Sequence, residues 1–391
     1  MLPGSIKRKI ILKMKAKSIK GKSTKEIQSA LQQSMADDFK PTLAIVFLPK
    51  KNEVQSITEI FDKKGILVFG VSSFGQFIDK DHDSDSIAVM LLEINPEYFK
   101  IDFRETGNST TKEIAKLIGE SGKKTFNKPA FIIASGGIRT DGEKIVEGIQ
   151  EAAGENTTLF GGLAASDFKI METFVFTNGK ISSNGLLAII LNEEKISVHG
   201  YATGGSQPVG IYHTITKSDG NIVYTIDEQP ALDLVLRYCG KGSGDLNKGI
   251  DMLNIASYFQ IQLDRKNASP IMRTPMYANL DDRSIVFAAS LPQESKVKFS
   301  ILPGFEVVDN LVAEFTEYSK NAGKADAVIL FSCAGREIAF GPYMSDEIDR
   351  LKKIWESPLI GLFSFGEIGH GSDGKYEFYN MTCSLALLKE N

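Results

Sequence analysis

Two segments of the sequence follow an apolar run with a serine and an arginine at the same spacing. They read Ser135-Gly136-Gly137-Ile138-Arg139 and Ser332-Cys333-Ala334-Gly335-Arg336. Loops at the carboxyl ends of parallel strands are where open α/β sheets bind ligands, and an arginine there offers a planar fork for a carboxylate or a phosphate. We therefore expect Arg139 and Arg336 to bind an anionic group; the alternative is a solvated surface arginine. A related third segment has Pro49-Lys50-Lys51 instead, which indicates that its loop has lost the role.

Acidic residues accompany a glycine-rich turn in two of the three related regions. Glu367 directly follows the run GLFSFG and Gln76 follows GVSSFG, whereas Asp167 ends the run GLAASD and is displaced by one position. Glu367 could accept the ammonium group of an amino acid whose carboxylate meets Arg336. The alternative is a structural ion pair between Arg336 and Glu367. Because acids are rarely fully buried without partners, we expect Asp167 and Glu367 to face one cavity.

Cys333 raises a catalytic alternative. It follows an apolar run at the start of a predicted helix, where the helix dipole would lower the pKa of a thiol, and His370 could act as its base. However, the sequence contains no G-x-S-x-G, Walker, G-x-G-x-x-G or H-E-x-x-H motif. Cysteine is also among the residue types that are most often buried. We therefore expect a binding protein rather than an enzyme and keep a cysteine-dependent hydrolase or transferase as the alternative.

Metal-ligand patterns are missing from the sequence. Its four histidines, His82, His199, His213 and His370, do not lie at metal-ligand spacing, and there is no C-x-x-C-H. We therefore expect no metal site.

The elements that must position these residues occur in one order three times. An apolar run, a helical stretch, a glycine-rich run and another apolar run cover Leu43–Glu93, Ala130–Asn192 and Ala327–Glu390, each after a further predicted helix. Continuous apolar runs such as AIVFL and AVILF are typical of strands buried on both faces, and a helix between two of them favours a right-handed parallel crossover. We predict an α/β fold with α+β character: mixed parallel and antiparallel sheets, helices on the outer faces, and three copies of a helix–strand–helix–strand–strand unit.

Residues 196–304 show a different, hairpin-rich pattern. Asp219-Gly220 predicts a type I′ turn, which needs positive φ at both central residues, and Pro230 suits the first turn of a helix over ALDLVLRY. We therefore predict three parts. They are a basic N-terminal segment at 1–22, a domain at 23–195 with two units, and a domain at 196–391 with the hairpin-rich insertion and the third unit.

Charge is distributed unevenly along the chain. The formal net charge is −4, but residues 1–22 carry eight basic residues and no acid, so the rest of the chain carries −12. Such an arm could contact phosphates or an anionic membrane surface. Lysines that alternate with apolar residues are also how an edge strand avoids unwanted pairing, and we favour that interpretation. We predict no nucleic-acid partner.

Composition indicates an ordinary globular protein of about two or three domains, with 391 residues, 42% hydrophobic and 24% charged. Three cysteines without metal-type spacing argue for a reducing compartment. No apolar run approaches the roughly 20 residues of a membrane-spanning helix. We expect a cytoplasmic protein without a transmembrane segment.

Several motifs together resemble FIST domains. They are GGLAASD in the second unit, GSQPVG from Gly205, the helix IDEQPALDLVLRY, and the terminal CAGR, GLFSFGEIG and NMT. Their order is that of an N-terminal FIST domain followed by its C-terminal partner, over about residues 25–390. The resemblance implies a sensory, ligand-binding protein of signal transduction, with amino acids proposed as ligands. It also implies coupling to a histidine kinase, a cyclic-dinucleotide enzyme or a chemoreceptor, here as a separate partner.

The same resemblance makes haem a candidate cofactor, because some members that respond to nitric oxide use it. We expect no cofactor, and if haem does bind we expect His199 to be its axial ligand. The candidate site is an interdomain cleft for an amino acid or a small carboxylate. Its expected residues are Arg139, Ser166, Asp167, His199, Tyr201, Pro208, Cys333, Arg336, Ser364, Gly366 and Glu367.

Overall fold

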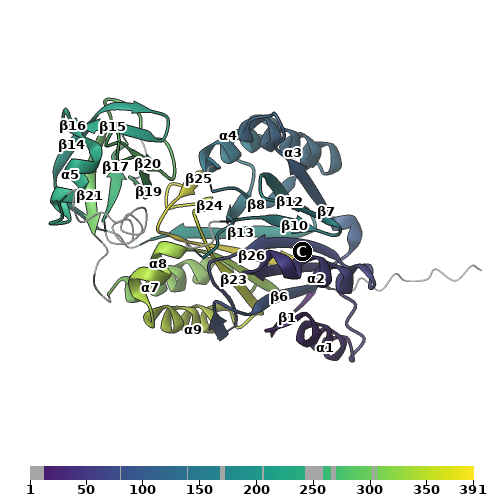
Figure 1. The fold of residues 1–391 in the computed structure, drawn as a ribbon. Helices are drawn as coiled ribbons and strands as arrows, with labels where there is room; N and C mark the ends of the chain where they lie inside the picture. The colour runs from purple at the N-terminus through teal and green to yellow at the C-terminus, as the bar shows by residue number, and fades with distance from the viewer. Residues whose placement is uncertain are drawn as a thin grey trace, which may run out of the picture.

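The protein consists of a main body of sheets and helices and a smaller lobe of strands (Figure 1). The computed structural model describes residues 13–79, 81–138, 140–167, 172–204, 207–242, 259–265, 270–301, 304 and 306–391. Three six-stranded sheets form the main body, and an eight-stranded sheet forms the lobe. Each six-stranded sheet mixes parallel and antiparallel pairs, which confirms the predicted fold class.

The three six-stranded sheets share one strand order. Two parallel strands lie side by side, followed on one side by an antiparallel strand and an edge strand, and on the other by a short hairpin. The first sheet has the order β1 (Lys15–Gly21), β6 (Ile87–Glu93), β2 (Leu43–Leu48), β3 (Leu67–Ser72), β10 (Val175–Thr177), β11 (Lys180–Ser182). The second has the order β7 (Phe99–Glu105), β12 (Gly185–Asn192), β8 (Pro129–Ser135), β9 (Leu159–Leu163), β24 (Glu367–His370), β25 (Tyr376–Tyr379). The third has the order β13 (Ile196–Thr203), β26 (Cys383–Glu390), β22 (Ala327–Cys333), β23 (Leu359–Ser364), β4 (Gln76–Ile78), β5 (Asp81–Asp83).

The hairpin at the end of each sheet comes from another unit of the chain. Hairpin β4–β5 of the first unit pairs with β23 of the third, β10–β11 of the second pairs with β3 of the first, and β24–β25 of the third pairs with β9 of the second. Because an isolated short hairpin is at best marginally stable, this exchange makes each sheet depend on two units. The internal repeat of the sequence itself stays a prediction.

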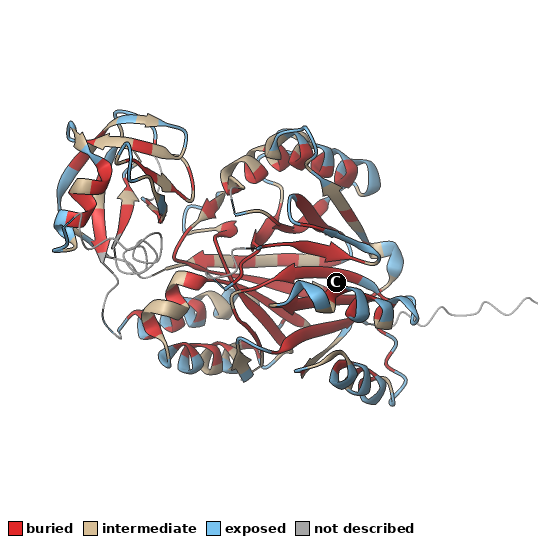
Figure 2. Cartoon of the chain, viewed as in Figure 1, coloured by how far each residue is buried: buried red, intermediate tan, exposed pale blue. Residues whose placement is uncertain are grey.

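The sheets pack their inner faces against one another in a common core. The cluster of buried apolar side chains there includes Ile45 of β2, Ile132 of β8 and Ile329 of β22. Neighbouring residues on the same strands, such as Val46, face outward and pack against helix residues such as Ile27. Strands are therefore buried on both faces (Figure 2), which explains their continuous apolar runs.

Helices cover the outer faces of the sheets (Figure 1). Thr110 caps α3 in a complete capping box with Glu113, whereas the carboxylate of Glu26 at the start of α1 accepts instead from the backbone N–H of Lys22. The helices of the main body are α1 (Thr24–Ser34), α2 (Val54–Asp62), α3 (Thr111–Thr125), α4 (Gly142–Ala153), α7 (Glu306–Ala322), α8 (Ala334–Phe340) and α9 (Tyr343–Trp355), with short 3-10 turns η1 (Lys51–Glu53) and η2 (Pro96–Tyr98).

The lobe has its own apolar core, which includes Ile215, Leu232 and Phe287. The predicted helix after Pro230 is present as α5 (Ala231–Tyr238). The predicted hairpin is also present, but its turn differs: Asp219 pairs with Ile222, and only Gly220 of the two turn residues has positive φ, so the turn is not type I′. The strands of the lobe are β14 (Gln207–Asp219), β15 (Ile222–Ile226), β16 (Gln229–Pro230), β17 (Phe259–Leu263), β18 (Ile271–Arg273), β19 (Pro275–Ala278), β20 (Ile285–Phe287) and β21 (Lys296–Ile301).

The end of the basic segment forms an edge strand. Strand β1 pairs antiparallel with β6, and Lys17 and Lys20 form ion pairs with Asp37 and Asp81. The edge-strand interpretation is therefore confirmed for residues 15–21, whereas residues 1–12 lie outside the described part of the chain. Within that described part, no helix combines the length and the apolarity needed to span a membrane. The predicted domain boundaries stay a prediction.

Candidate functional site

A pocket of about 520 Å³ lies at the carboxyl ends of the central strands, where the three units meet. Four carboxylates, one lysine and one histidine lie in its wall. The first unit supplies most of this wall, and the other two units supply one acid each. The lining residues are Pro49, Lys50, Phe74, Gly75, His82, Asp83, Ser84, Asp85, Asp167 and Glu337.

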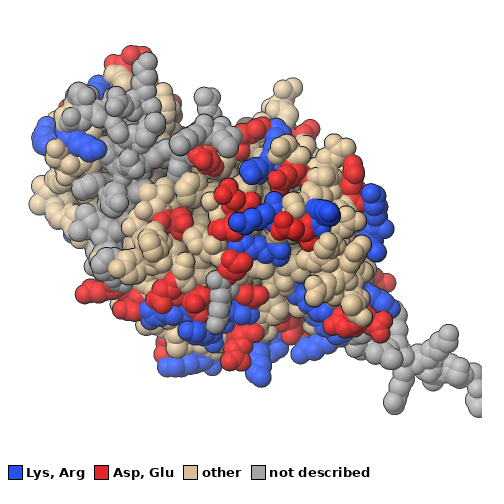
Figure 3. Space-filling model, turned by 60° about the horizontal axis from the view of Figure 1, so that its bottom comes forward, with Lys and Arg blue, Asp and Glu red and all other residues tan. Residues whose placement is uncertain are grey.

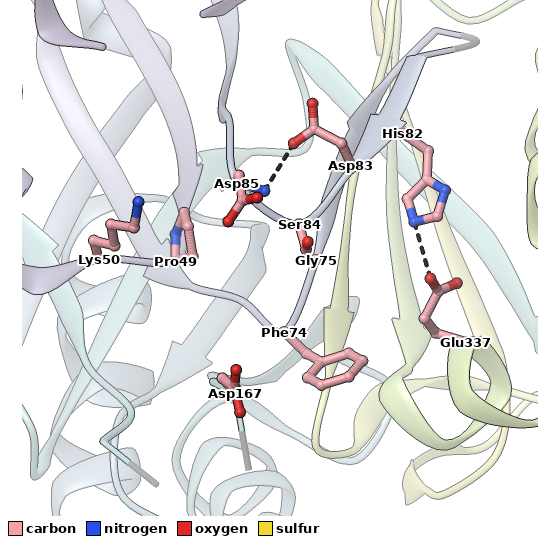
Figure 4. A pocket seen from close by; sticks show the side chains of 10 residues that line it. All are labelled: Pro49, Lys50, Phe74, Gly75, His82, Asp83, Ser84, Asp85, Asp167 and Glu337. Atoms are coloured by element: carbon pink, nitrogen blue, oxygen red, sulfur yellow. Dashed lines mark hydrogen bonds and ion pairs between the residues drawn. The ribbon is translucent and has the colours of Figure 1, made fainter. Parts of the chain in front are cut away.

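The charged groups surround the pocket from several elements (Figure 4). The carboxylates of Asp85 and Asp167 lie above and below its middle, Lys50 lies to one side, and the His82–Glu337 pair lies on the other. His82 Nε2 is 3.1 Å from Glu337 Oε1, so β5 of the first unit contacts α8 of the third at this side of the pocket. The wall therefore carries more negative than positive groups.

Asp83 is held as a carboxylate by its neighbours. Partial burial would raise the pKa of Asp83, but the ammonium of Lys20 and the backbone N–H groups of Asp85 and Ser86 lower it to about 2. These bonds also fix the turn that carries Asp85. This side of the pocket is therefore negatively charged and ordered.

Arg336 does not line the pocket. Its side chain is fully buried on α8, and Nη2 lies 2.5 Å from Oε2 of Glu347 on α9. The guanidinium Nε and Nη1 have no hydrogen-bond partner among the described residues. The expectation that Arg336 faces an open cleft is therefore wrong, because α9 covers it. The alternative of an ion pair with Glu367 is also replaced, since the partner is Glu347.

Glu367 lies in the same interior region as Arg336. Its Oε1 accepts from Ser364 Oγ at 2.6 Å, and its Oε2 accepts from the backbone N–H and the hydroxyl of Thr382. Burial raises the pKa of Glu367 to about 8, although these hydrogen bonds oppose the rise. The carboxyl group is therefore protonated near neutral pH. Asp167 lines the pocket and Glu367 does not, so the expected common cavity of the two acids is wrong.

Cys333 is a packed thiol. Burial raises its pKa far above the ordinary value, Glu367 raises it further, and Sγ lies 3.7 Å from Met381 Sδ. His370 lies elsewhere, with its ring against Phe160 and Tyr201. The geometry therefore gives no support to a cysteine nucleophile with His370 as its base.

Three glycines show which residues of the three units are equivalent. Gly70, Gly161 and Gly361 occupy the same place, each paired with a residue of an exchanged hairpin. Counted from them, Gln76, Asp167 and Glu367 all lie six residues later, so Asp167 is not displaced. The second unit has two adjacent glycines, and Gly161 rather than Gly162 is the counterpart of Gly70 and Gly361.

The other expected site residues are dispersed. His199 and Tyr201 lie on β13 beneath α7, where both rings pack against Tyr318. The remaining ones lie as follows: Ser166 is buried before Asp167, Gly366 is packed against Phe378, Pro208 is exposed on β14 of the lobe, and Arg139 lies outside the described residues.

Haem stays a prediction that the surroundings of His199 do not favour. Its Nδ1 lies 3.4 Å from Tyr318 Oη, and the two ring centroids lie 6.5 Å apart, so the tyrosine occupies space that a macrocycle would need. Burial lowers the pKa of His199, and the neutral imidazole is the form that binds metals, so the obstacle is the space that Tyr318 occupies rather than the charge of the ring.

Sequence reasoning missed most of the pocket. It took the loop at Lys50 as having lost its role, yet Pro49 and Lys50 line the pocket. It also passed over the acidic run from Asp79 to Asp85, which resembles an ordinary solvated loop. The density of acids in that run next to the glycine turn at Gly75 is the signal that could have found it.

Comparisons with known proteins agree with this architecture. The chain matches the model of the FIST N domain over residues 42–229 and that of the FIST C domain over residues 231–370. The boundary between the two matches falls at the start of α5. An uncharacterized protein of Methanocaldococcus jannaschii is 22% identical over 368 residues, which covers 83% of this chain and 69% of that protein. The chain therefore belongs to the FIST family, whose members are sensory domains of signal transduction.

Proposed function

We propose that this protein binds a small molecule with an ammonium group, most simply an amino acid, in the pocket between Lys50 and Glu337, and that it signals through a separate protein. The observation that carries the proposal is the pocket itself: about 520 Å³, with Asp83, Asp85, Asp167 and Glu337 in its wall and a single lysine. Ligand pockets of proteins are commonly about 300–1,000 Å³.

The charges of the wall favour an ammonium group over a simple carboxylate. A ligand ammonium can approach the acids of the pocket, and a ligand carboxylate can approach Lys50. An anion without an ammonium group would be repelled by four carboxylates and attracted by only one lysine. Of the two ligand classes expected from the sequence, the amino acid is therefore supported better than the small carboxylate.

The position of the pocket supports a sensory role. Its wall joins hairpin β4–β5, the loop after β9 and helix α8, which belong to three different units. A ligand that contacts all three and binds one relative arrangement more tightly than another shifts the population toward that arrangement, which is how a binding event is transmitted. A cytoplasmic location is part of the proposal and is supported by three free thiols, at Cys239, Cys333 and Cys383.

A thermal-shift series with matched analogues tests the ligand class. Each amino acid is compared with its N-acetyl derivative, which lacks the ammonium, and with its amide, which lacks the carboxylate. Ligand at a hundred times its dissociation constant adds about 2.7 kcal/mol of stability. We expect stabilisation by an amino acid, loss of it on acetylation and a smaller loss on amidation. Equal stabilisation by the acetylated form would refute the role of the acids.

The variant Asp167→Asn locates the site. It removes one charge from the pocket wall and should weaken ammonium binding by about tenfold. Asp281→Asn, which removes an exposed carboxylate of the lobe, is the control and should leave binding unchanged. Ligand binding that both variants retain in full would place the site elsewhere.

A further inference from the structure

Strand β14 of the lobe carries a bulge that exposes two large side chains. Pairing with β21 runs through Val209 and resumes at His213, so residues 210–212 lie opposite the single residue Lys298. Gly210 allows the turn with a φ of 75°. Ile211 is 69% exposed and Tyr212 is 53% exposed. Bulges of this kind re-aim side chains.

Polar contacts of the buried side chain of His213 hold the end of the bulge in place. His213 Nδ1 lies 2.6 Å from Asp227 Oδ2, and Nε2 lies 2.9 Å from Tyr238 Oη. The tyrosine ring stacks on Phe299 with centroids 4.2 Å apart. Asp227 also accepts from the backbone N–H next to His213 while its own φ is 49°, a conformation that persists only where the surroundings impose it.

These contacts explain two motifs that the pocket leaves unused. Gly210 belongs to GSQPVG, and Asp227 and Tyr238 belong to IDEQPALDLVLRY. Both motifs converge on the bulge, one forming its turn and the other fixing its end. Residues of both motifs thus stabilise a local conformation that exposes Ile211 and Tyr212.

Positive charge accompanies the two exposed side chains. The ammonium of Lys298 lies 4.3 Å from the centroid of the Tyr212 ring, which orients the ring. Lys296 donates to the hydroxyl of Thr214 at 2.6 Å. Both contacts are with neutral groups, although the ammonium of Lys296 also lies close enough to Asp227 to lower the pKa of that carboxyl group. The nearby Asp227 uses both of its oxygens in the contacts that hold the bulge.

We propose that Ile211, Tyr212, Lys296 and Lys298, here named the bulge surface, bind an acidic signalling protein. Its partner would take Ile211 and Tyr212 into an apolar pocket and place carboxylates against the two lysines. Tyrosine is enriched among the residues that contribute most to the affinity of an interface, and charges around such an anchor select the partner. Strand β14 and helix α5 lie on the side of the lobe away from the main body, where a partner has access (Figure 1). The surface depends on the proposed signalling role but not on the identity of the ligand.

Site-specific photo-crosslinking tests the surface in cells that make the full-length protein. A benzophenone amino acid replaces Tyr212, and in a matched control it replaces Tyr277, a 59% exposed tyrosine of the same lobe. We expect one protein to crosslink from position 212 and not from 277. That protein is then purified, and its affinity for the parent chain is measured by calorimetry at two salt concentrations.

Variants decide the outcome. Ile211→Asp and Lys298→Glu should each weaken binding of the crosslinked protein at least tenfold, and added salt should also weaken it. Tyr277→Asp should leave the affinity unchanged. All variants should unfold near the temperature of the parent. Crosslinks only to a second copy of this chain, only to lipid, or to nothing at position 212 would overturn the proposal, as would full affinity in Ile211→Asp. Asp167→Asn tests the pocket separately, because it leaves the bulge surface intact.

Discussion

Gln76 and Glu367 occupy the same position in two sheets, and each accepts a hydrogen bond from a serine three residues earlier. Ser73 Oγ lies 2.5 Å from Gln76 Oε1, and Ser364 Oγ lies 2.6 Å from Glu367 Oε1. The amide of Gln76 also donates to two backbone carbonyl groups. A pKa of about 8 keeps Glu367 neutral as well near pH 7. Both sites therefore hold a neutral side chain that accepts from the preceding serine, but Gln76 Nε2 donates to carbonyl groups whereas Glu367 Oε2 accepts from Thr382.

Replacement of Glu367 by glutamine should change how stability depends on pH. The folded pKa of Glu367, about 8, lies above its unfolded value of 4.5. Between these values the folded state keeps a proton that the unfolded chain releases, so the free energy of unfolding falls as pH rises. This contribution is fully present below pH 4.5 and is lost by about pH 8. Glu367→Gln should remove a slope of up to about 1.4 kcal/mol per pH unit.

Chemical denaturation at pH 5.5, 6.5 and 7.5 measures this difference. The parent and Glu367→Gln share all other titrating groups, so the difference between their free energies isolates residue 367. Asp281→Asn, at an exposed site, serves as the control with a parallel curve. Parallel curves for the parent and Glu367→Gln would mean that Glu367 is ionised in the folded protein.

Exchange of hairpins between units predicts a sensitive glycine. A Cβ added at Gly361 would lie 2.1 Å from the ring of Phe77, which belongs to the hairpin from the first unit. Overpacking of this kind costs about 1–3 kcal/mol. Gly361→Ala should therefore lower the melting temperature, and Phe77→Leu in the same chain should restore part of the loss. If the double variant is as unstable as the sum of the two single variants, the two residues do not clash as described.

The buried Arg336–Glu347 pair and a ligand clamp at Arg336 predict opposite effects of Arg336→Ala on stability. A clamp at Arg336 would tolerate Arg336→Ala in the absence of ligand. In this structure that change leaves Glu347 buried without its partner, and breaking a buried pair costs about 3–5 kcal/mol. Arg336→Ala should therefore destabilise the protein strongly, and the double variant Arg336→Met, Glu347→Leu should recover much of the loss. Denaturation with urea measures the free energy of unfolding of both variants. Unchanged stability in Arg336→Ala would support a ligand-binding role for Arg336 instead.

The apolar runs of the sequence predicted the central strands well. Residues such as Ile45 and Ile329 lie in runs that are buried on both faces, and short runs of this kind, rich in β-branched residues, are typical of such strands. The exchanged hairpins could not be predicted in the same way. Strand β4 has three residues, which is too short for a period, and its partner Gly361 is far away in the sequence.

The site was harder to predict because its residues depend on long-range packing. Arg336 and Glu347 are eleven residues apart on two helices that are separated by a break at Gly341, so the periodicity of one helix could not pair them. Lys50 and Asp85 lie in polar segments that are typical of solvated loops. Their meeting with Asp167 and Glu337 follows only from the way the three units are joined.

Two arginines that join the lobe to the main body should differ in importance. Arg273 is almost fully buried, pairs with Glu143 of α4 and donates to the backbone carbonyl of Phe378. Arg265 pairs with Glu377 through two nitrogens, but both side chains are about one-fifth exposed. A partly solvated pair contributes about 1 kcal/mol or less, whereas the loss of a buried partner costs about 3–5 kcal/mol.

Arg273→Met should therefore weaken the attachment of the lobe more than Arg265→Met. We expect calorimetry to show the lobe unfolding in a separate, earlier transition in Arg273→Met, because the lobe has its own apolar core and loses its main link to α4. Arg265→Met should keep a single transition within a few degrees of the parent. A single transition at an unchanged temperature in Arg273→Met would show that apolar contacts, rather than this arginine, hold the lobe in place.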